Sequence, residues 1–258
     1  MATIIATTAV SFGLVSVPVQ LSPATEEHRL PLHEVHLPDS GRIRHRRFCE
    51  REDREVPYAE VGRGLAMPDG TVAALAEADL ERLPLPSRHR MDVLGFVHAD
   101  EVDPILYRRA YYAHPASLAA ERPYEVLVAA LARTGLVGIA KGAIRSRERL
   151  VVLRPRRGVL VAHTIYWPDE VREPGPAPAT PVTDREMELA ELLLNELRGV
   201  DATDVRDDYE DALQQLAAAL TAGRELAAAA EPEGPPVDLM AALQASVRAA
   251  QADLGAKS

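Results

Sequence analysis

Residues 136–165 read LVGIAKGAIRSRERLVVLRPRRGVLVAHTI and hold three strand candidates in close succession. The candidates are 136–144, 149–153 and 158–165, and each is short, largely apolar and bounded by charged residues or glycine. Short strands joined by close turns are typical of a β-barrel or a β-sandwich. The stretch therefore predicts a mainly β fold for this part of the chain.

The sequence before this stretch has the same character. Two further hairpins are predicted around the turns at 38–41 and 68–70. Helical spacing of apolar residues occurs only at 75–83 and 124–133. Alternating apolar and polar residues predict strands over 4–12, 14–21, 30–37, 42–48, 91–97 and 105–112.

The composition changes near residue 170. A Pro- and Ala-rich linker at 173–181 precedes a capping box formed by Thr183 and Glu186, and a second linker lies at 231–236. Apolar residues beyond both linkers recur at helical spacing. We therefore expect three parts, which are a β core over 1–170, a helical arm over 171–230 and a short amphipathic helix over 231–258.

The net charge conceals an uneven distribution. The chain carries 29 Lys and Arg against 39 Asp and Glu, and this formal charge of −10, taken alone, argues against nucleic acid as a partner. Residues 1–170 hold 22 basic and 22 acidic side chains, whereas 171–258 hold 7 and 17. Seven basic residues lie within 141–157, against the single acid Glu148: Lys141, Arg145, Arg147, Arg149, Arg154, Arg156 and Arg157. A core that contacts phosphate, followed by an acidic helical part, fits this distribution.

The spacing of Arg145, Arg147 and Arg149 is the strongest binding signal. On an extended chain these side chains share one face at intervals of about 6.5–7 Å, close to the spacing of phosphates along one DNA strand. The alternative is a solvated edge strand, whose charges prevent unwanted pairing. Further members of the set would be Lys141 and Arg154 on the same stripe, and Arg42, Arg44 and Arg46 on the first hairpin.

No pattern for catalysis or metal binding stands out. Cys49 is the single cysteine, which excludes an intramolecular disulfide and a cysteine zinc cluster. Four histidines lie close in sequence, but their spacing matches neither a zinc protease nor a zinc finger. We expect no catalytic residue, no cofactor and no metal, and the alternative of a metal-dependent hydrolase would have to use His28, His33, His36 and His45.

Nine short motifs are distributed along the chain. They are SFGLVSVPV (11–19), GRIR (41–44), EVPY (55–58), LPLPS (83–87), EVDPI (101–105), IAKGAIRSRE (139–148), LRP (153–155), RDDYE (206–210) and VDLMAAL (237–243). These motifs resemble those of the bacterial Ku proteins, which bind DNA ends in non-homologous end joining, and the likeness runs in the family's order from about residue 4 to 250.

The resemblance implies a Ku-type β-barrel core with an inserted bridge and a helical C-terminal arm. Two such subunits form a homodimeric ring around double-stranded DNA, bind its ends without reading sequence and recruit an ATP-dependent DNA ligase. The family has no catalytic activity of its own. The DNA-binding residues implied by the resemblance or by the basic runs are Lys141, Arg145, Arg147, Arg149, Arg154, Arg156, Arg157, Arg42, Arg44 and Arg46.

The C-terminal segment has two interpretations. It resembles the family's short C-terminal element and would dock a partner through Leu239, Met240, Leu243 and Val247, or it packs this apolar seam on its own domain. Many relatives have paired cysteines and a Lys-rich tail, whereas here Cys49 is alone and the sequence ends in Ala256-Lys257-Ser258. A Ku-like paralogue with weak DNA binding, acting as an interaction scaffold or pairing with another Ku chain, is therefore the alternative. Either protein is expected in the cytoplasm, with the nucleoid and without a membrane partner.

Overall fold

The computed structural model describes residues 3–26, 32–83, 89–144, 147–199, 201–224 and 238–257. These residues form two compact units, divided between Glu173 and Pro174. Among the described helices, none is both long enough and apolar enough to cross a membrane.

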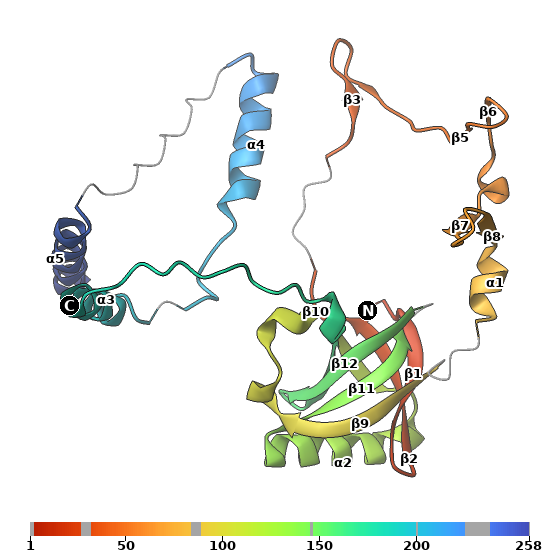
Figure 1. Ribbon diagram of the computed structural model, residues 1–258, viewed down its shortest axis with the longest axis horizontal. Coiled ribbons are helices and arrows are strands. Elements are labelled where there is room, and N and C mark those ends of the chain that lie inside the picture. The colour runs from red at the N-terminus through yellow and green to blue at the C-terminus, as the bar shows by residue number, and fades with distance from the viewer. Residues whose placement is uncertain are drawn as a thin grey trace. The chain divides into compact units, whose positions relative to one another are not determined.

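Seven strands of the described chain form a closed barrel in the first unit (Figure 1). Neighbouring strands pair antiparallel, except that the first and last in the order below pair in parallel and so close the barrel. The predicted mainly β fold with helices is confirmed, and a barrel is found rather than a sandwich. In pairing order the strands are β1 (Ala6–Phe12), β2 (Val15–Pro23), β10 (Tyr107–Pro115), β13 (Val159–Ile165), β12 (Arg147–Arg156), β11 (Leu136–Ile144) and β9 (Arg90–His98).

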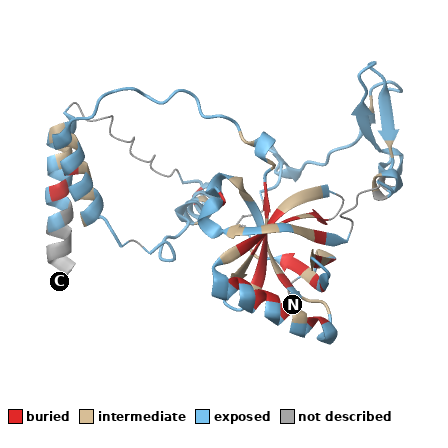
Figure 2. Cartoon of the chain, turned by 60° about the horizontal axis from the view of Figure 1, so that its bottom comes forward, coloured by how far each residue is buried: buried red, intermediate tan, exposed pale blue. Residues whose placement is uncertain are grey.

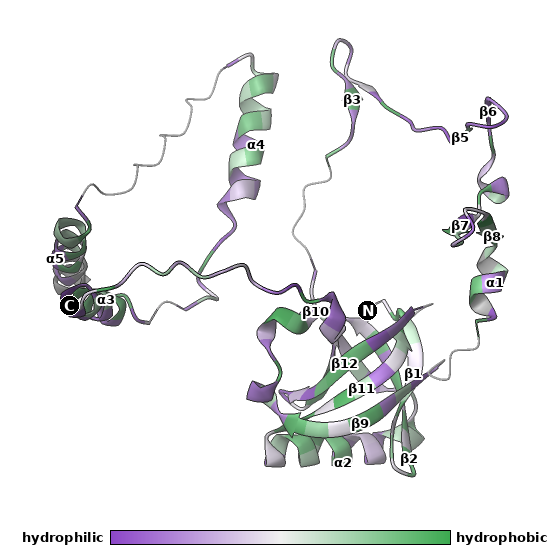
Figure 3. Ribbon diagram, viewed as in Figure 1, coloured by the Kyte–Doolittle hydropathy of each residue, from purple (hydrophilic) through white to green (hydrophobic). Residues whose placement is uncertain are grey.

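Alternate residues of these strands fill the barrel. Figure 2 shows buried residues along the barrel strands, and Figure 3 shows many hydrophobic residues on the same strands. On β12 the inward residues are Val151 and Leu153, which are buried in the main apolar cluster. Val152 lies between them and belongs to a second cluster on the outer wall. Burial of each such side chain contributes about 1.5–3 kcal/mol. Because strand side chains alternate, this assignment fixes which face every β12 residue occupies.

The helix α2 (Leu118–Thr134) closes one end of the barrel, adding Leu127 and Leu131 to the interior. Its Tyr124 hydroxyl donates to the Ala113 carbonyl at 2.7 Å and accepts from the Leu160 amide at 2.8 Å. Burial raises the pKa of Tyr124. The helix ends at Gly135 as predicted, because φ of +70° there suits glycine.

The described part of the segment between β2 and β9 is almost entirely exposed and contains three small hairpins. The hairpin predicted over 30–48 is present but much shorter than expected, since only two residues pair on each side; Val35 and Leu37 are exposed, and residues 30–31 lie outside the described residues. The hairpin predicted around 68–70 is confirmed. The elements are β3 (Val35–His36), β4 (Gly41–Arg42), β5 (Phe48–Cys49), β6 (Arg54–Glu55), β7 (Arg63–Ala66), β8 (Val72–Leu75) and α1 (Glu77–Glu81).

The second unit is helical, with α3 (Asp184–Glu196), α4 (Asp208–Thr221) and α5 (Leu239–Lys257). The predicted capping box is present, because the Thr183 hydroxyl accepts from the Glu186 amide and the Glu186 carboxylate accepts from the Thr183 amide at 2.7 Å. The Thr183 hydroxyl also donates to the Glu186 carboxylate at 2.6 Å, and this bond first, then the bond from the Thr183 amide, lowers the pKa of Glu186. The helices α3 and α5 lie side by side in Figures 1 and 2.

Candidate nucleic-acid interface

The strand β12 carries several of the predicted DNA-binding residues, but it distributes them over two faces. Arg147 and Arg149 have the inward parity of Val151 and Leu153, and they pair with Ile144 and Gly142 of β11. A direct cross-strand pair shares one face of a sheet. The shared face predicted for Arg147 and Arg149 is therefore confirmed in this geometric sense.

The predicted extension of that stripe is wrong. Lys141 pairs with Leu150, and Arg154 has the same parity as Val152, so both side chains belong to the outer wall. In the pairing of β11 with β12, an even-numbered residue of one strand lies opposite an odd-numbered residue of the other, so Lys141 and Arg149 are on different faces. Arg145 lies outside the described residues.

Arg147 and Arg149 lie at the end of the barrel opposite α2, which we call the mouth. The insertion is attached at this same end, because β2 ends at Pro23 and β9 begins at Arg90. Pro23 pairs with Tyr111 of β10, and Met91, which follows Arg90, pairs with Gly142 of β11; both partners are mouth residues too. The inserted segment thus leaves and re-enters the barrel at the same end as the two arginines.

A recess of about 300 Å³ opens at the mouth. Its lining includes two arginines that the sequence analysis missed, Arg108 and Arg109 of β10, together with Arg149. Pairing between β10 and β13 shifts register between Tyr107 and Ala110, so both arginines occupy a β-bulge. Two adjacent charged residues inside the strand-like run YRRAYY were the available signal, since they break its alternation.

The outer-wall cations have local partners. The Lys141 ammonium lies 2.9 Å from the Glu148 carboxylate and 5.8 Å from the centre of the Trp167 ring. Arg154 Nε is buried without a hydrogen-bond partner in the described part of the chain. Burial lowers the pKa of His163, and the nearby Arg154 and Arg156 lower it further. This wall is a packed surface rather than a row of free cations.

Arg156 and Arg157 lie at the α2 end of β12. They follow Arg147 by about nine residues, so roughly 30 Å separates them from the mouth along the strand. Arg157 adopts a positive φ of 49° in the turn to β13, and it lines a surface hollow with Glu125 of α2. The six described basic residues of 141–157 therefore do not form one patch.

The arginines predicted on the first hairpin are also dispersed. Arg42 belongs to β4, whereas Arg44 and Arg46 follow the strand, so alternation no longer aligns their side chains. Arg46 donates to the Glu55 carboxylate at 3.0 Å. Its charge is thus already partly compensated.

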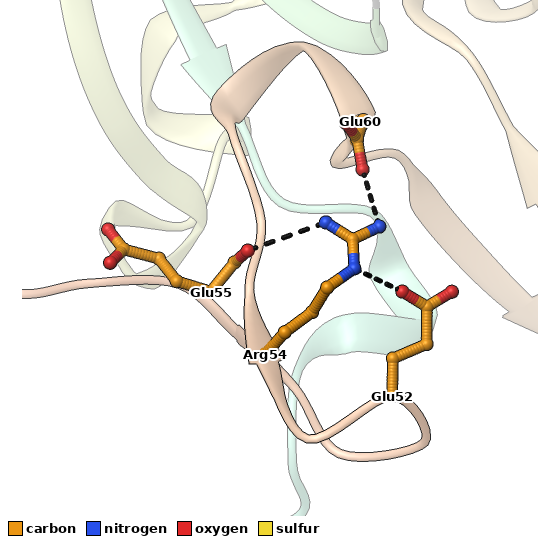
Figure 4. Close-up of polar contacts among 4 residues, drawn as sticks. All are labelled: Glu52, Arg54, Glu55 and Glu60. Carbon is orange, nitrogen blue, oxygen red and sulfur yellow. Dashed lines mark hydrogen bonds and ion pairs between the residues drawn. The ribbon is translucent and has the colours of Figure 1, made fainter.

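Arg54 is compensated more fully, as Figure 4 shows. Its guanidinium donates to the Glu52 carboxylate at 2.5 Å, to the Glu60 carboxylate at 3.1 Å and to the Glu55 carbonyl at 3.5 Å. The bonds to Glu52 and Glu60 raise the pKa of Arg54. The arginine count of the insertion therefore overstates the charge available to a polyanion.

The C-terminal seam is largely covered within its own unit. Val247 is buried, Met240 and Leu243 are half-buried, and Leu239 is exposed. The seam packs on α3, where Leu189 is buried. The interpretation of packing on its own domain thus applies to most of the seam, and docking through it stays a prediction.

Comparison with known proteins identifies the family. The family model of the Ku70/Ku80 beta-barrel domain matches residues 11–189. The "Non-homologous end joining protein Ku" of Streptomyces griseus is 43% identical over 249 residues, covering 94% of this chain and 63% of that protein. "Non-homologous end joining protein Ku 2" of Saccharopolyspora erythraea is 40% identical, covering 93% and 81%. The protein Ku of Mycobacterium tuberculosis is 35% identical, covering 94% of both.

The chain spans 63% of the length of its Streptomyces griseus and Frankia casuarinae relatives. The matched barrel domain extends from β1 into α3, and so contains the mouth and the insertion. The names of these relatives place them in non-homologous end joining. By its barrel and by its relatives, the chain belongs to the Ku family.

Proposed function

We propose that this protein binds double-stranded DNA ends without sequence specificity, as a ring-shaped homodimer in non-homologous end joining. The observation that carries the proposal is the match to the Ku barrel across residues 11–189. The function is non-enzymatic, since the protein holds the broken DNA ends while a separate ligase joins them.

The mouth supplies the phosphate contacts. Arg147, Arg149, Arg108 and Arg109 lie at this end of the barrel, and none of them has a carboxylate partner in the described part of the chain. Guanidinium groups bind phosphate oxygens through paired hydrogen bonds and carry no base information. These arginines have no described acidic partner, and they lie at the end of the barrel where the insertion begins and ends. Both features support contact with DNA phosphates at this end.

The helical unit supplies dimerisation and partner contacts. The helix α4 leaves Tyr209, Leu216 and Leu220 exposed, and a second copy of this chain covers them in the proposed dimer. Leu239 at the start of α5 is the exposed residue of the predicted docking seam, where we place contact with an ATP-dependent DNA ligase. Both roles follow the family's organisation.

The test compares one duplex sequence as an open linear fragment and as a closed minicircle. A threaded ring binds the fragment and not the circle, and light scattering of the same sample gives the mass of two chains. If roughly 6–10 phosphates are neutralised, affinity falls about 10³–10⁵-fold between 50 and 200 mM salt. Ligase added to the linear arm joins ends faster with the wild type than with Leu239→Asp. Equal binding to the circle would exclude the ring.

The alternative is a Ku-like scaffold with weak DNA binding. Its support is the surplus of acidic residues in 171–258, with 17 acidic against 7 basic side chains. A scaffold retains ligase in a pull-down without DNA and gives little binding to the linear fragment. A ring that clamps DNA ends gives the opposite result, with tight binding to the linear fragment and little retention of ligase in the absence of DNA.

A further inference from the structure

The recess at the barrel mouth is a concave site with one sign of charge. Its lining consists of Arg108, Arg109, Tyr111, Ile144, Arg149 and Thr164, with no carboxylate among them. Ile144 and Thr164 are buried at its base, whereas Arg108 and Arg109 are exposed and Arg149 is half-buried. A cavity of about 300 Å³ is at the small end of the range for ligand sites.

The backbone around the recess fixes the two adjacent arginines. At the bulge, the Thr164 hydroxyl accepts from the Arg109 amide at 3.1 Å and donates to the Arg109 carbonyl at 3.2 Å. The guanidinium of Arg108 stacks 4.4 Å from the centre of the Tyr166 ring. The bulge therefore holds two consecutive side chains at the recess, where a regular strand would send them to opposite faces.

Three cations in one recess repel each other unless an anion joins them. Within the described chain, no acidic group pairs with Arg108, Arg109 or Arg149, in contrast to Arg46 and Arg54 of the insertion. The neighbouring Glu148 lies on the opposite face of β12 and contacts Lys141. No described side chain thus supplies the anion that these three cations would bind.

We propose that this recess binds a phosphate dianion, held by Arg108, Arg109 and Arg149. A tetrahedral dianion matches several guanidinium forks at once, better than a monovalent carboxylate does. Tyr111 adds a hydroxyl donor, because its side chain lines the recess without a protein hydrogen-bond partner in the described residues. The phosphate comes either from a small phosphorylated molecule or from the terminal 5′-phosphate of a nucleic acid.

The first test is a calorimetric titration of the full chain with inorganic phosphate, with chloride at equal ionic strength as the reference. The wild type binds phosphate saturably, and Arg109→Gln weakens binding at least about 10-fold, as expected for a lost charged contact. The variant keeps the bulge, because the bonds from residue 109 to Thr164 use main-chain atoms. Arg133→Gln, at the exposed end of α2, is the matched control and retains wild-type affinity.

Saturation absent at about 10 mM phosphate would overturn the proposal, as would equal affinities of the wild type and Arg109→Gln. The second test compares linear duplexes that carry a 5′-phosphate or a 5′-hydroxyl. A preference for the phosphorylated duplex that Arg109→Gln loses assigns the terminal phosphate, whereas equal affinity with retained phosphate binding assigns a small phosphorylated ligand. Phosphate binding and DNA end binding can fail separately. The comparison of linear fragment with minicircle tests end binding, whichever 5′ group the linear fragment carries, and the titration with inorganic phosphate tests the recess.

Discussion

The two ends of the barrel are formed by the same strands but hold opposite kinds of side chain. At the α2 end, Tyr124 bonds two buried backbone groups, and Leu127 and Leu131 complete the apolar interior. At the mouth, Arg108 and Arg149 line a recess without a carboxylate. Arginine is also present at the α2 end, but there Arg157 shares its surroundings with Glu125.

This difference separates stability from binding within one small fold. Clustered cations lower the stability of the folded chain through mutual repulsion, whereas a closed apolar end raises it. The charged mouth and the apolar end are formed by the same strands. Apolar packing at one end can therefore compensate for the stability lost through charge repulsion at the other. A change at one end is therefore expected to alter mainly one of the two properties.

The largest expected effect is charge reversal at the mouth. The double variant Arg147→Glu and Arg149→Glu weakens binding to linear duplex at least about 100-fold, since it removes two phosphate contacts and adds two repulsive charges. Fluorescence anisotropy at fixed salt measures the affinity. Circular dichroism of the same sample reports whether the barrel is intact.

The matched variant reverses Arg156 and Arg157 at the α2 end, which changes the net charge by the same amount. We expect a much smaller loss of affinity there, because a change of net charge acts on DNA weakly beyond a Debye length of about 10 Å. Equal losses in the two double variants would show that net charge, and not the mouth, determines binding.

The sequence predicted the strands better than their faces. The largely apolar run at 136–144 predicted a strand, and β11 has those bounds, because a strand that is buried along most of its length reads as a continuous apolar run. The prediction that Lys141 and Arg149 share one face was wrong. The pairing of β11 with β12 decides whether the odd-numbered or the even-numbered residues of each strand face inward. A single sequence contains no direct record of that pairing.

Two functional features depend on contacts between distant segments. The recess needs the bulge at Arg108 and Arg109, which is held by Thr164 from another strand. The spacing of apolar residues predicted the apolar face of α5, but it did not predict that α3 covers this face. Helical periodicity shows which face of a helix is buried and not which element packs on it.

The second prediction concerns the closed end. Tyr124→Phe leaves the Ala113 carbonyl and the Leu160 amide without their buried partner, which lowers the free energy of unfolding by about 2–4 kcal/mol. Urea denaturation measures the loss. Affinity for linear duplex, measured where both proteins are folded, stays unchanged, and a parallel loss of affinity would contradict the separation of the two ends.

Tyr112→Phe is the control for removing a phenol oxygen. Tyr112 is half-buried on the same strand as Ala113, and its hydroxyl has no hydrogen bond in the described part of the chain. The free energy of unfolding then changes by less than about 0.5 kcal/mol.

The smallest expected effect is a pH dependence of the free energy of unfolding, which arises from His163 on the outer wall of the barrel. Burial first, and then Arg154 and Arg156, lower the pKa of His163 in the folded barrel below its ordinary value of 6.5. As pH falls below about 6.5, the unfolded chain binds a proton at this position before the folded chain does, so stability decreases. Above that pH the imidazole is neutral in both states and contributes no slope.

His163→Gln therefore flattens the decrease in unfolding free energy between pH 7.5 and about 5, by less than about 1 kcal/mol for a partly solvated group. Urea midpoints across this pH range measure it, with His114→Gln as an exposed control on the neighbouring strand β10. Binding by the arginines of the mouth keeps its affinity wherever the barrel is folded, because guanidinium groups stay protonated. A steeper decrease in the His163 variant would show that the outer wall favours the charged imidazole, contrary to the direction argued from burial and the two arginines.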